Sequence, residues 1–198
     1  MTRPFVRAAL SLLTAVALAA PAVAVAPAGD PEFPRDWFYD NDEQWAAHEP
    51  LVGKKAPKLE LGDWLDKKTK LNPKKDFAGK VVVLDFWATW CGPCIASIPH
   101  NKEMVEKYGK DGLVFLAICT ANGQEALEKV GAEHKIDYPC AKDPGEKSAK
   151  AFAVQYFPTY VVVDRTGKVR AVGLKPDKVE GVVKKLLAEP APEAAAAK

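Results

Sequence analysis

The sequence predicts an α/β protein in which a sheet is flanked by helices, and three features support this prediction. Residues 81–86 (VVVLDF) are apolar and rich in β-branched residues, as in a strand buried on both faces. A helix is expected to open at Cys91 and to reach Tyr108. Residues 113–119 (LVFLAIC) then form a second apolar strand. Strands and helices alternate along the chain, which is typical of α/β folds.

The composition predicts one exported domain with a redox role for its cysteines. The 198 residues are enough for a single domain with a sizeable core. The 28 Lys and Arg residues nearly balance the 26 Asp and Glu residues, so we expect no nucleic-acid partner. Four cysteines are few for a small protein held together by disulfides. They are many for a structural protein without redox chemistry.

Residues 1–28 are predicted to be a signal peptide. Arg3 and Arg7 precede an uncharged apolar run over residues 8–20, and three A-x-A cleavage sites follow within residues 22–28. An uncleaved membrane anchor is the alternative, because the Ala-rich segment is just long enough to span a bilayer. We therefore expect an exported protein, periplasmic or otherwise extracytoplasmic, in a compartment where disulfides persist.

Residues 29–50 are predicted to form an extended N-terminal arm. The arm carries a cluster of aromatic residues: Trp37, Phe38, Tyr39 and Trp45. We expect these rings to pack on the domain, with a partner-binding patch as the alternative. His48 has no evident partner in the sequence and is predicted to be solvent-exposed.

The folded domain is expected over residues 51–188, and its elements follow from apolar spacing and turn residues. Alternation at Leu59 and Leu61 predicts a short β-hairpin within residues 51–71. The later elements are a helix over 124–135, a strand over 137–142, a helix over 146–156, a hairpin of strands 160–164 and 168–173, and a helix from Pro176. Residues 189–198 lack an apolar face, which predicts a disordered tail.

Cys91 and Cys94 follow the buried strand directly and are the candidate catalytic residues. A thiol at a helix N-terminus faces unpaired N–H groups and the positive end of the helix dipole, which favour its thiolate. Cys91 is therefore the predicted nucleophile. Cys94 lies one helical turn later and is the predicted resolving thiol. Gly92 leaves the sulfur accessible, and Pro93 suits the first turn.

Redox chemistry is favoured over a zinc site or an inert structural disulfide at Cys91 and Cys94. A zinc site would need a second cysteine pair at ligand spacing, and Cys119 and Cys140 are not arranged as C-x-x-C. We therefore expect no metal and no cofactor.

Asp85 is a further candidate catalytic residue, because it lies in a run so apolar that its carboxyl must be paired, hydrated or protonated. A buried carboxyl near Cys94 can take the proton of that thiol. His100 and His134 lie among charged residues on helical stretches, and both are predicted to be solvent-exposed.

Residues 90–94 (WCGPC) reproduce the signature of the thioredoxin superfamily, which the chain resembles over about residues 51–188. The resemblance implies a thioredoxin fold with a central mixed sheet. It implies that Asp85 moves protons for the resolving cysteine, that Pro99 marks a helix kink, and that Phe157-Pro158 holds a cis-proline against the disulfide. The residues expected to contact substrate are Trp90, Gly92, Pro93, Phe157 and Pro158.

Two features resemble the TlpA-like branch, which includes ResA-type proteins. These are the G-x-x-A-P pattern at residues 53–57 and the long link between Cys94 and Pro158. The branch implies an N-terminal hairpin and a helix–strand insertion before the cis-proline. Cys140 would lie in that insertion beside the strand ending at Cys119. A structural disulfide is favoured there, worth about 3 kcal/mol; a second redox couple and unpaired buried thiols remain open.

The resemblance implies an exported thiol:disulfide oxidoreductase acting on protein disulfides or dithiols. The Gly-Pro pair matches reducing thioredoxins, so we favour reduction, with electrons from a membrane donor and a monomeric state. The alternatives are a disulfide-forming oxidase, a thiol peroxidase of the peroxiredoxin type and a non-catalytic binding module. Ser97 stands where relatives in cytochrome c maturation carry Glu, so that role is not assigned.

Overall fold

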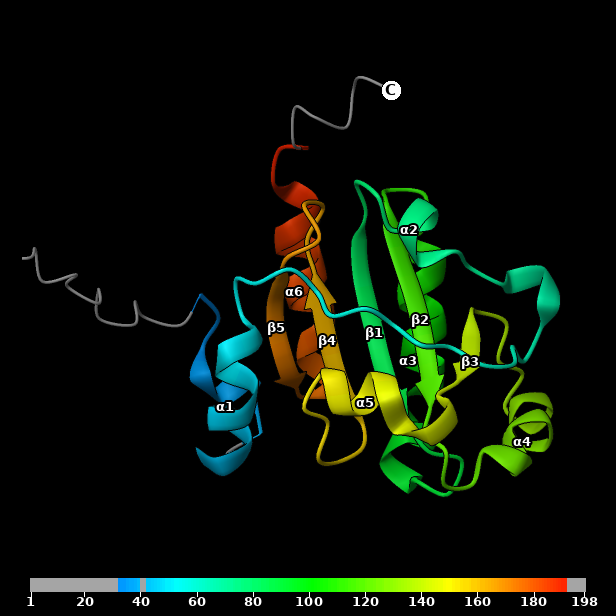
Figure 1. The fold of residues 1–198 in the computed structure, drawn as a ribbon. Coiled ribbons are helices and arrows are strands. Elements are labelled where there is room, and N and C mark those ends of the chain that lie inside the picture. The colour runs from blue at the N-terminus through cyan, green and yellow to red at the C-terminus, as the bar shows by residue number, and fades with distance from the viewer. Residues whose placement is uncertain (1–31, 40–41, 192–198) are drawn as a thin grey trace, which may run out of the picture. The chain divides into compact units, whose positions relative to one another are not determined.

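The computed structural model describes residues 32–39 and 42–191. Within them the chain forms a five-stranded mixed sheet in the order β3-β2-β1-β4-β5 (Figure 1). The strands are β1 (Val81–Trp87), β2 (Leu113–Cys119), β3 (Cys140–Lys142), β4 (Thr159–Val163) and β5 (Val169–Leu174). Strands β1, β2 and β3 are parallel, and β4 is antiparallel to both of its neighbours.

The helices of this part are α1 (Asp42–His48), α2 (Pro73–Asp76), α3 (Gly92–Tyr108), α4 (Leu127–Glu133), α5 (Lys147–Ala151) and α6 (Pro176–Ala188). Helices α3 and α6 cover one face of the sheet and contribute to the core cluster that contains Cys91 and Cys94. Helix α5 and the chain before β1 cover the other face, which Figure 1 shows towards the viewer. The sheet therefore separates two apolar layers.

Strand β1 is the centre of the sheet, and all seven of its residues are buried. Alternate side chains serve opposite layers, with Val81 and Val83 on the α3 side and Val82 and Leu84 on the α5 side. A strand buried on both faces consists mainly of apolar residues. The burial of all of β1 therefore confirms the strand predicted from the apolar run over residues 81–86. Asp85 is the exception in that run.

The N-terminal arm is not extended, contrary to the prediction. It contains α1 and short 3₁₀ turns, and its rings pack on the domain: Tyr39 contacts Tyr156 edge to face at 5.2 Å between centroids. The prediction of an exposed His48 is also wrong. Its ring is 3% exposed, and Nε2 lies 3.1 Å from the carbonyl oxygen of Ala153, because α1 directs this side chain against the segment after α5.

The predicted hairpin within residues 51–71 does not form. Residues 54–65, here called the strap, cross the α5 face of the sheet in extended conformation. The strap pairs with distant segments instead of with itself, through isolated bridges from Lys55 to Lys168 and from Trp64 to Ala141. Leu59 and Leu61, whose alternation predicted the hairpin, are partly buried and pack against the core.

The predicted helix over residues 146–156 is shorter than expected. Glu146 and Ala153 both have left-handed backbone conformations, with φ of 57° and 53°, and these positions limit α5 to Lys147–Ala151. Between α3 and Pro158 the chain also forms β2, α4 and β3. That α4 and β3 are an insertion relative to smaller thioredoxins stays a prediction.

The C-terminal part of the described chain is held by arginines. Glu189, assigned to the tail, pairs with Arg170 at 2.9 Å, and its carbonyl oxygen accepts a hydrogen bond from Arg165. The rest of the predicted tail beyond residue 191 and the predicted signal peptide lie outside the described residues. Among residues 32–39 and 42–191, no helix has the length and apolar content needed to cross a membrane.

Candidate active site

Cys91 and Cys94 lie where β1 leads into α3, and they form a disulfide. Cys91 is the N-cap of α3, and its Sγ accepts a hydrogen bond from the backbone N–H of Cys94 at 3.2 Å. In the reduced protein the same N–H and the helix dipole would favour a thiolate at Cys91. Cys91 is 5% exposed and Cys94 2% exposed, so an incoming partner meets Cys91 first.

Cys91 lies between exposed residues on one side and two aromatic rings on the other. Gly92 and Pro93 are exposed, and a Cβ atom at Gly92 would meet nothing within 4 Å. Trp90 is 58% exposed and lies edge to face with Phe157, with 6.1 Å between the ring centroids. This leaves an apolar surface beside the disulfide that a partner chain can contact.

The loop after β2 fixes Trp90, which sequence reasoning did not anticipate. Indole Nε1 of Trp90 donates to the carbonyl oxygen of Asn122 at 3.1 Å, and Thr89 Oγ1 donates to that of Gly123 at 2.7 Å. Gly123 has a φ of 88°, and a Cβ atom there would lie 2.7 Å from both Thr89 Oγ1 and Trp90 Cδ1. Only the Asn-Gly turn in the sequence hinted at this close approach.

The Phe157–Pro158 peptide bond is cis, as the resemblance implied. It immediately precedes β4, in which Thr159 is paired with Phe86 of β1. Because the two strands are antiparallel, Pro158 lies at the C-terminal end of β1, where the segment carrying Cys91 begins.

Asp85 is buried beneath α3 in a polar cluster. Its Oδ2 accepts a hydrogen bond from Asn101 Nδ2 at 3.0 Å, and Tyr160 Oη donates to Asn101 Oδ1 at 3.1 Å. Oδ1 of Asp85 has no hydrogen-bond partner among the described residues. Burial raises the pKa of Asp85 to about 7, against the lowering effect of the hydrogen bonds from Asn101 and Tyr160.

This cluster shares a helix face with Cys94. The buried residues of α3 include Cys94, Ser97 and Asn101, spaced by about one helical turn each. Ser97 Oγ donates to the carbonyl oxygen of Pro93 at 2.9 Å and is also a hydrogen-bond partner of Tyr160. Asn101 and Tyr160 were not predicted from the sequence. The feature that could have indicated Asn101 is its position two helical turns after Cys94, which places it on the same face of the helix.

Cys119 and Cys140 are free thiols in the described part of the chain, contrary to the structural disulfide that we favoured. Cys140 is paired with Ala117, two residues before Cys119. From strand spacing and rise, this offset separates the two Cα atoms by about 8 Å, beyond the usual disulfide span. Burial raises the pKa of Cys119 to about 12 and also raises that of Cys140, so neither is a ready nucleophile.

The two remaining histidines differ. His134 is exposed as predicted, whereas His100 is half-buried, and its Nε2 has no hydrogen-bond partner within the described ranges. In the same ranges, no group of three or more His, Cys, Asp or Glu residues is arranged to hold a metal ion.

Comparison with protein families matches residues 51–188 to the Redoxin family. The chain belongs to the Redoxin family. It is 35% identical over 118 residues to the thiol-disulfide oxidoreductase ResA of Bacillus thuringiensis subsp. konkukian, covering 60% of this chain and 66% of that protein. It is 33% identical over 138 residues to ResA of Bacillus anthracis, covering 68% and 78% of the two chains.

Solved structures agree with this assignment. A putative thiol:disulfide interchange protein DsbE from Chlorobium tepidum matches with a TM-score of 0.60 and 32% identity, over 69% of this chain and 96% of that one. A thioredoxin-like superfamily protein at 24% identity matches with a TM-score of 0.62, over 70% and 99%. The predicted α/β thioredoxin-like fold is confirmed, as is the prediction of a TlpA/ResA-type thiol-disulfide oxidoreductase.

Proposed function

We propose that this redoxin is an exported enzyme that reduces disulfide bonds in other proteins. The observation that carries the proposal is the Cys91–Cys94 disulfide at the N-terminus of α3, where Cys91 Sγ accepts the N–H of Cys94 at 3.2 Å. A sulfur at that position is stabilised as a thiolate and is an effective attacking group at neutral pH.

The reaction proceeds in two exchanges. In the reduced enzyme, the Cys91 thiolate attacks one sulfur of a partner disulfide, which forms a mixed disulfide and releases the other partner sulfur as a thiolate. Cys94, once deprotonated, attacks Cys91 Sγ and releases the second partner thiolate. Two electrons pass to the partner, whose thiolates take up protons, and the enzyme is left with the Cys91–Cys94 disulfide.

Asp85 accepts the proton of Cys94 during the second exchange. Its carboxyl lies under the helix that carries Cys94, and its pKa of about 7 lets it bind and release a proton near neutral pH. Asn101 and Tyr160 hold the carboxyl in place. The partner polypeptide docks on residues around Cys91: Trp90, Gly92, Pro93, Phe157 and Pro158.

The reducing direction rests on Gly92 and Pro93 between the cysteines, which match reducing thioredoxins. In this role the enzyme is recharged by a membrane electron donor outside the cytoplasm, after removal of residues 1–28 or anchored through them. No observation favours the peroxidase or the binding module over this role.

The direction is tested by the equilibrium reduction potential of the Cys91–Cys94 couple, together with turnover of a disulfide-bonded protein such as insulin. We expect a potential near that of thioredoxin, about −270 mV, and loss of turnover in Cys91→Ser and Cys94→Ser. The matched control, Cys119→Ala with Cys140→Ala, leaves the reduction potential and the turnover unchanged. A potential near that of DsbA, about −120 mV, would instead identify a disulfide-forming oxidase.

A further inference from the structure

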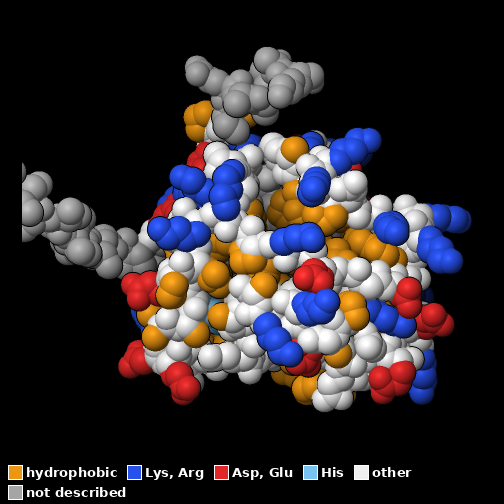
Figure 2. All heavy atoms as spheres, in the orientation of Figure 1, with side chains coloured by type: hydrophobic (Ala, Val, Ile, Leu, Met, Phe, Trp, Pro, Cys, Tyr) orange, Lys and Arg blue, Asp and Glu red, His pale blue; other side chains and the backbone are white. Residues whose placement is uncertain are grey.

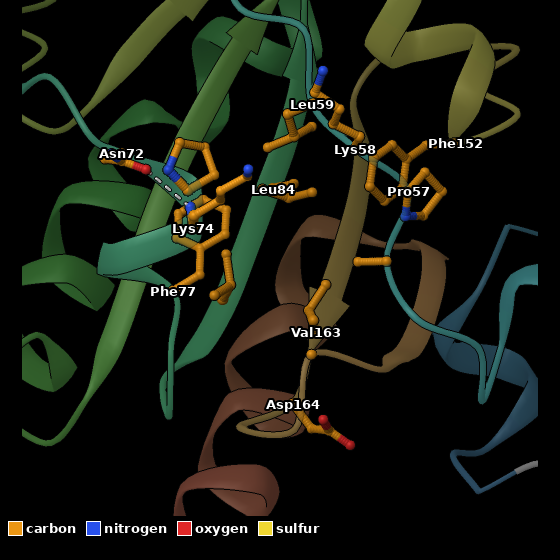
Figure 3. Close-up of a pocket in the computed structure, with 14 residues that line it drawn as sticks. Pro57, Lys58, Leu59, Asn72, Lys74, Phe77, Leu84, Phe152, Val163 and Asp164 are labelled. Atoms are coloured by element: carbon orange, nitrogen blue, oxygen red, sulfur yellow. Dashed lines mark hydrogen bonds between the residues drawn. The ribbon is translucent and has the colours of Figure 1, made fainter. Parts of the chain in front are cut away.

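An apolar hollow lies on the α5 face of the sheet, opposite the catalytic cysteines. It has a volume of about 420 Å³ and is bounded by the strap, α2, β1 and β4. Its walls include Pro57, Leu59, Phe77, Val82, Leu84 and Val163. Figure 3 shows Leu84 between side chains from α2 on one side and from the strap on the other. A volume of this order is typical of sites for small ligands.

The walls of the hollow offer few groups that could hydrogen-bond a polar ligand. The accessible apolar surface of the hollow comes from half-buried side chains such as Leu59 and Phe77, whereas Val82 and Leu84 beneath them are each 1% exposed. The Asp164 carboxylate at one end is already occupied, because Oδ1 accepts hydrogen bonds from the backbone N–H groups of Thr166 and Lys168. A polar ligand would lose its hydrogen bonds with water here without replacement.

The mouth of the hollow is positively charged. Lys58 on the strap and Lys74 on α2 both line it, and neither forms a salt bridge in the described part of the chain. Figure 3 places the two lysines on different sides of Leu84. Figure 2 shows exposed hydrophobic side chains on this face with Lys and Arg side chains around them. An apolar floor with a cationic rim matches a ligand that is apolar at one end and anionic at the other.

We propose that this hollow binds a straight-chain carboxylate, with the acyl chain against Leu59 and Phe77 and the headgroup at Lys58 and Lys74. The hollow and the disulfide belong to separate apolar layers on opposite faces of the sheet. Binding here is therefore independent of the proposed disulfide reduction, and either proposal can fail without the other.

The first test is calorimetric titration of the full-length protein with octanoate and decanoate. Burying one methylene strengthens binding about fourfold, so decanoate is expected to bind about 16-fold more tightly than octanoate. Ala56 lines the hollow, and Ala56→Trp fills it and abolishes binding. Ala78→Trp, an exposed position outside the hollow, leaves binding intact. Far-UV circular dichroism and thermal unfolding of both variants report that they are folded, whether or not the protein reduces disulfides.

The second test separates the charge from the apolar contact. Lys58→Gln with Lys74→Gln is expected to weaken decanoate binding by roughly 2- to 30-fold and to leave decan-1-ol binding unchanged. The matched pair Lys110→Gln with Lys150→Gln removes the same charge outside the hollow and leaves the binding of decanoate and of decan-1-ol unchanged.

Three results would overturn the proposal. One is the absence of saturable decanoate binding by the wild-type protein. Another is that both pairs of lysine substitutions weaken decanoate binding equally, because the effect would then reflect net charge alone. The third is binding to phosphatidylglycerol vesicles without binding of decanoate, which would assign this face to a membrane surface.

Discussion

Replacing Asn101 by Leu removes a hydrogen bond to Asp85 Oδ2 and keeps a side chain of nearly the same size. A hydrogen bond to a charged group contributes about 1.5–3 kcal/mol, and 1.36 kcal/mol corresponds to one pKa unit. Because this hydrogen bond favours the carboxylate, Asn101→Leu is expected to raise the pKa of Asp85 from about 7 by about one to two units.

The change should appear in the second exchange, in which we propose that Asp85 accepts the Cys94 proton. At pH 7 about half of the wild-type Asp85 is ionised, and after the shift roughly 1–10% remains so. Resolution of the mixed disulfide is therefore expected to slow by roughly 5- to 50-fold at pH 7 and to recover as the pH rises. Stopped-flow tryptophan fluorescence of single turnovers, measured from pH 5.5 to 9.5, follows this step.

Two controls distinguish proton transfer from loss of structure. Asp85→Asn should remove the inflection near pH 7, and alkylation of Cys91 should proceed at the wild-type rate in both variants. Tyr160→Phe removes the hydroxyl that hydrogen-bonds Asn101 and that also lowers the pKa of Asp85, so a shift in the same direction is expected. The reasoning fails if Asn101→Leu slows resolution equally at every pH, or if Asp85→Asn keeps the inflection.

Four further predictions concern stability, docking and the second cysteine pair. Burial raises the pKa of Asp85 to about 7 in the folded protein, above its value in the unfolded chain, so the contribution of Asp85 to stability should be greatest at low pH and fall by about 4 kcal/mol as the pH rises from 4 to 8. Urea denaturation of wild type and of Asp85→Asn at each pH measures this contribution as the difference between their free energies of unfolding. Gly123→Val should destabilise the fold by about 1–3 kcal/mol in thermal denaturation. Trp90→Ala should lower kcat/KM for insulin about fivefold or more and leave the thermal unfolding of the protein unchanged. Iodoacetamide at pH 8 should leave Cys119 and Cys140 unmodified until the protein is denatured, and rapid labelling of the native protein would contradict their burial.

The sequence by itself determined the elements whose pattern is local. An apolar run defines β1 and β2 almost to the residue, and the amphipathic spacing from Pro176 defines α6. The five residues from Trp90 to Cys94 fix the chemistry, because a thiol at a helix start needs only its own helix to be activated. Alternation at Leu59 and Leu61 predicted a hairpin that does not form, although both side chains pack against the core.

The tertiary structure alone decided how distant segments meet. The strap pairs with the β4–β5 turn and with β3 instead of folding back on itself, a choice of partner that its own alternation does not encode. The register of β3 on β2 sets Cys140 opposite Ala117 and keeps it from bonding Cys119. His48 and Tyr160 acquire their partners from segments 59 or more residues away, and Asn101 bonds both Tyr160 and Asp85 of β1. Their roles depend on side-chain contacts that exist only once the sheet and its helices have packed, and no local pattern specifies such contacts.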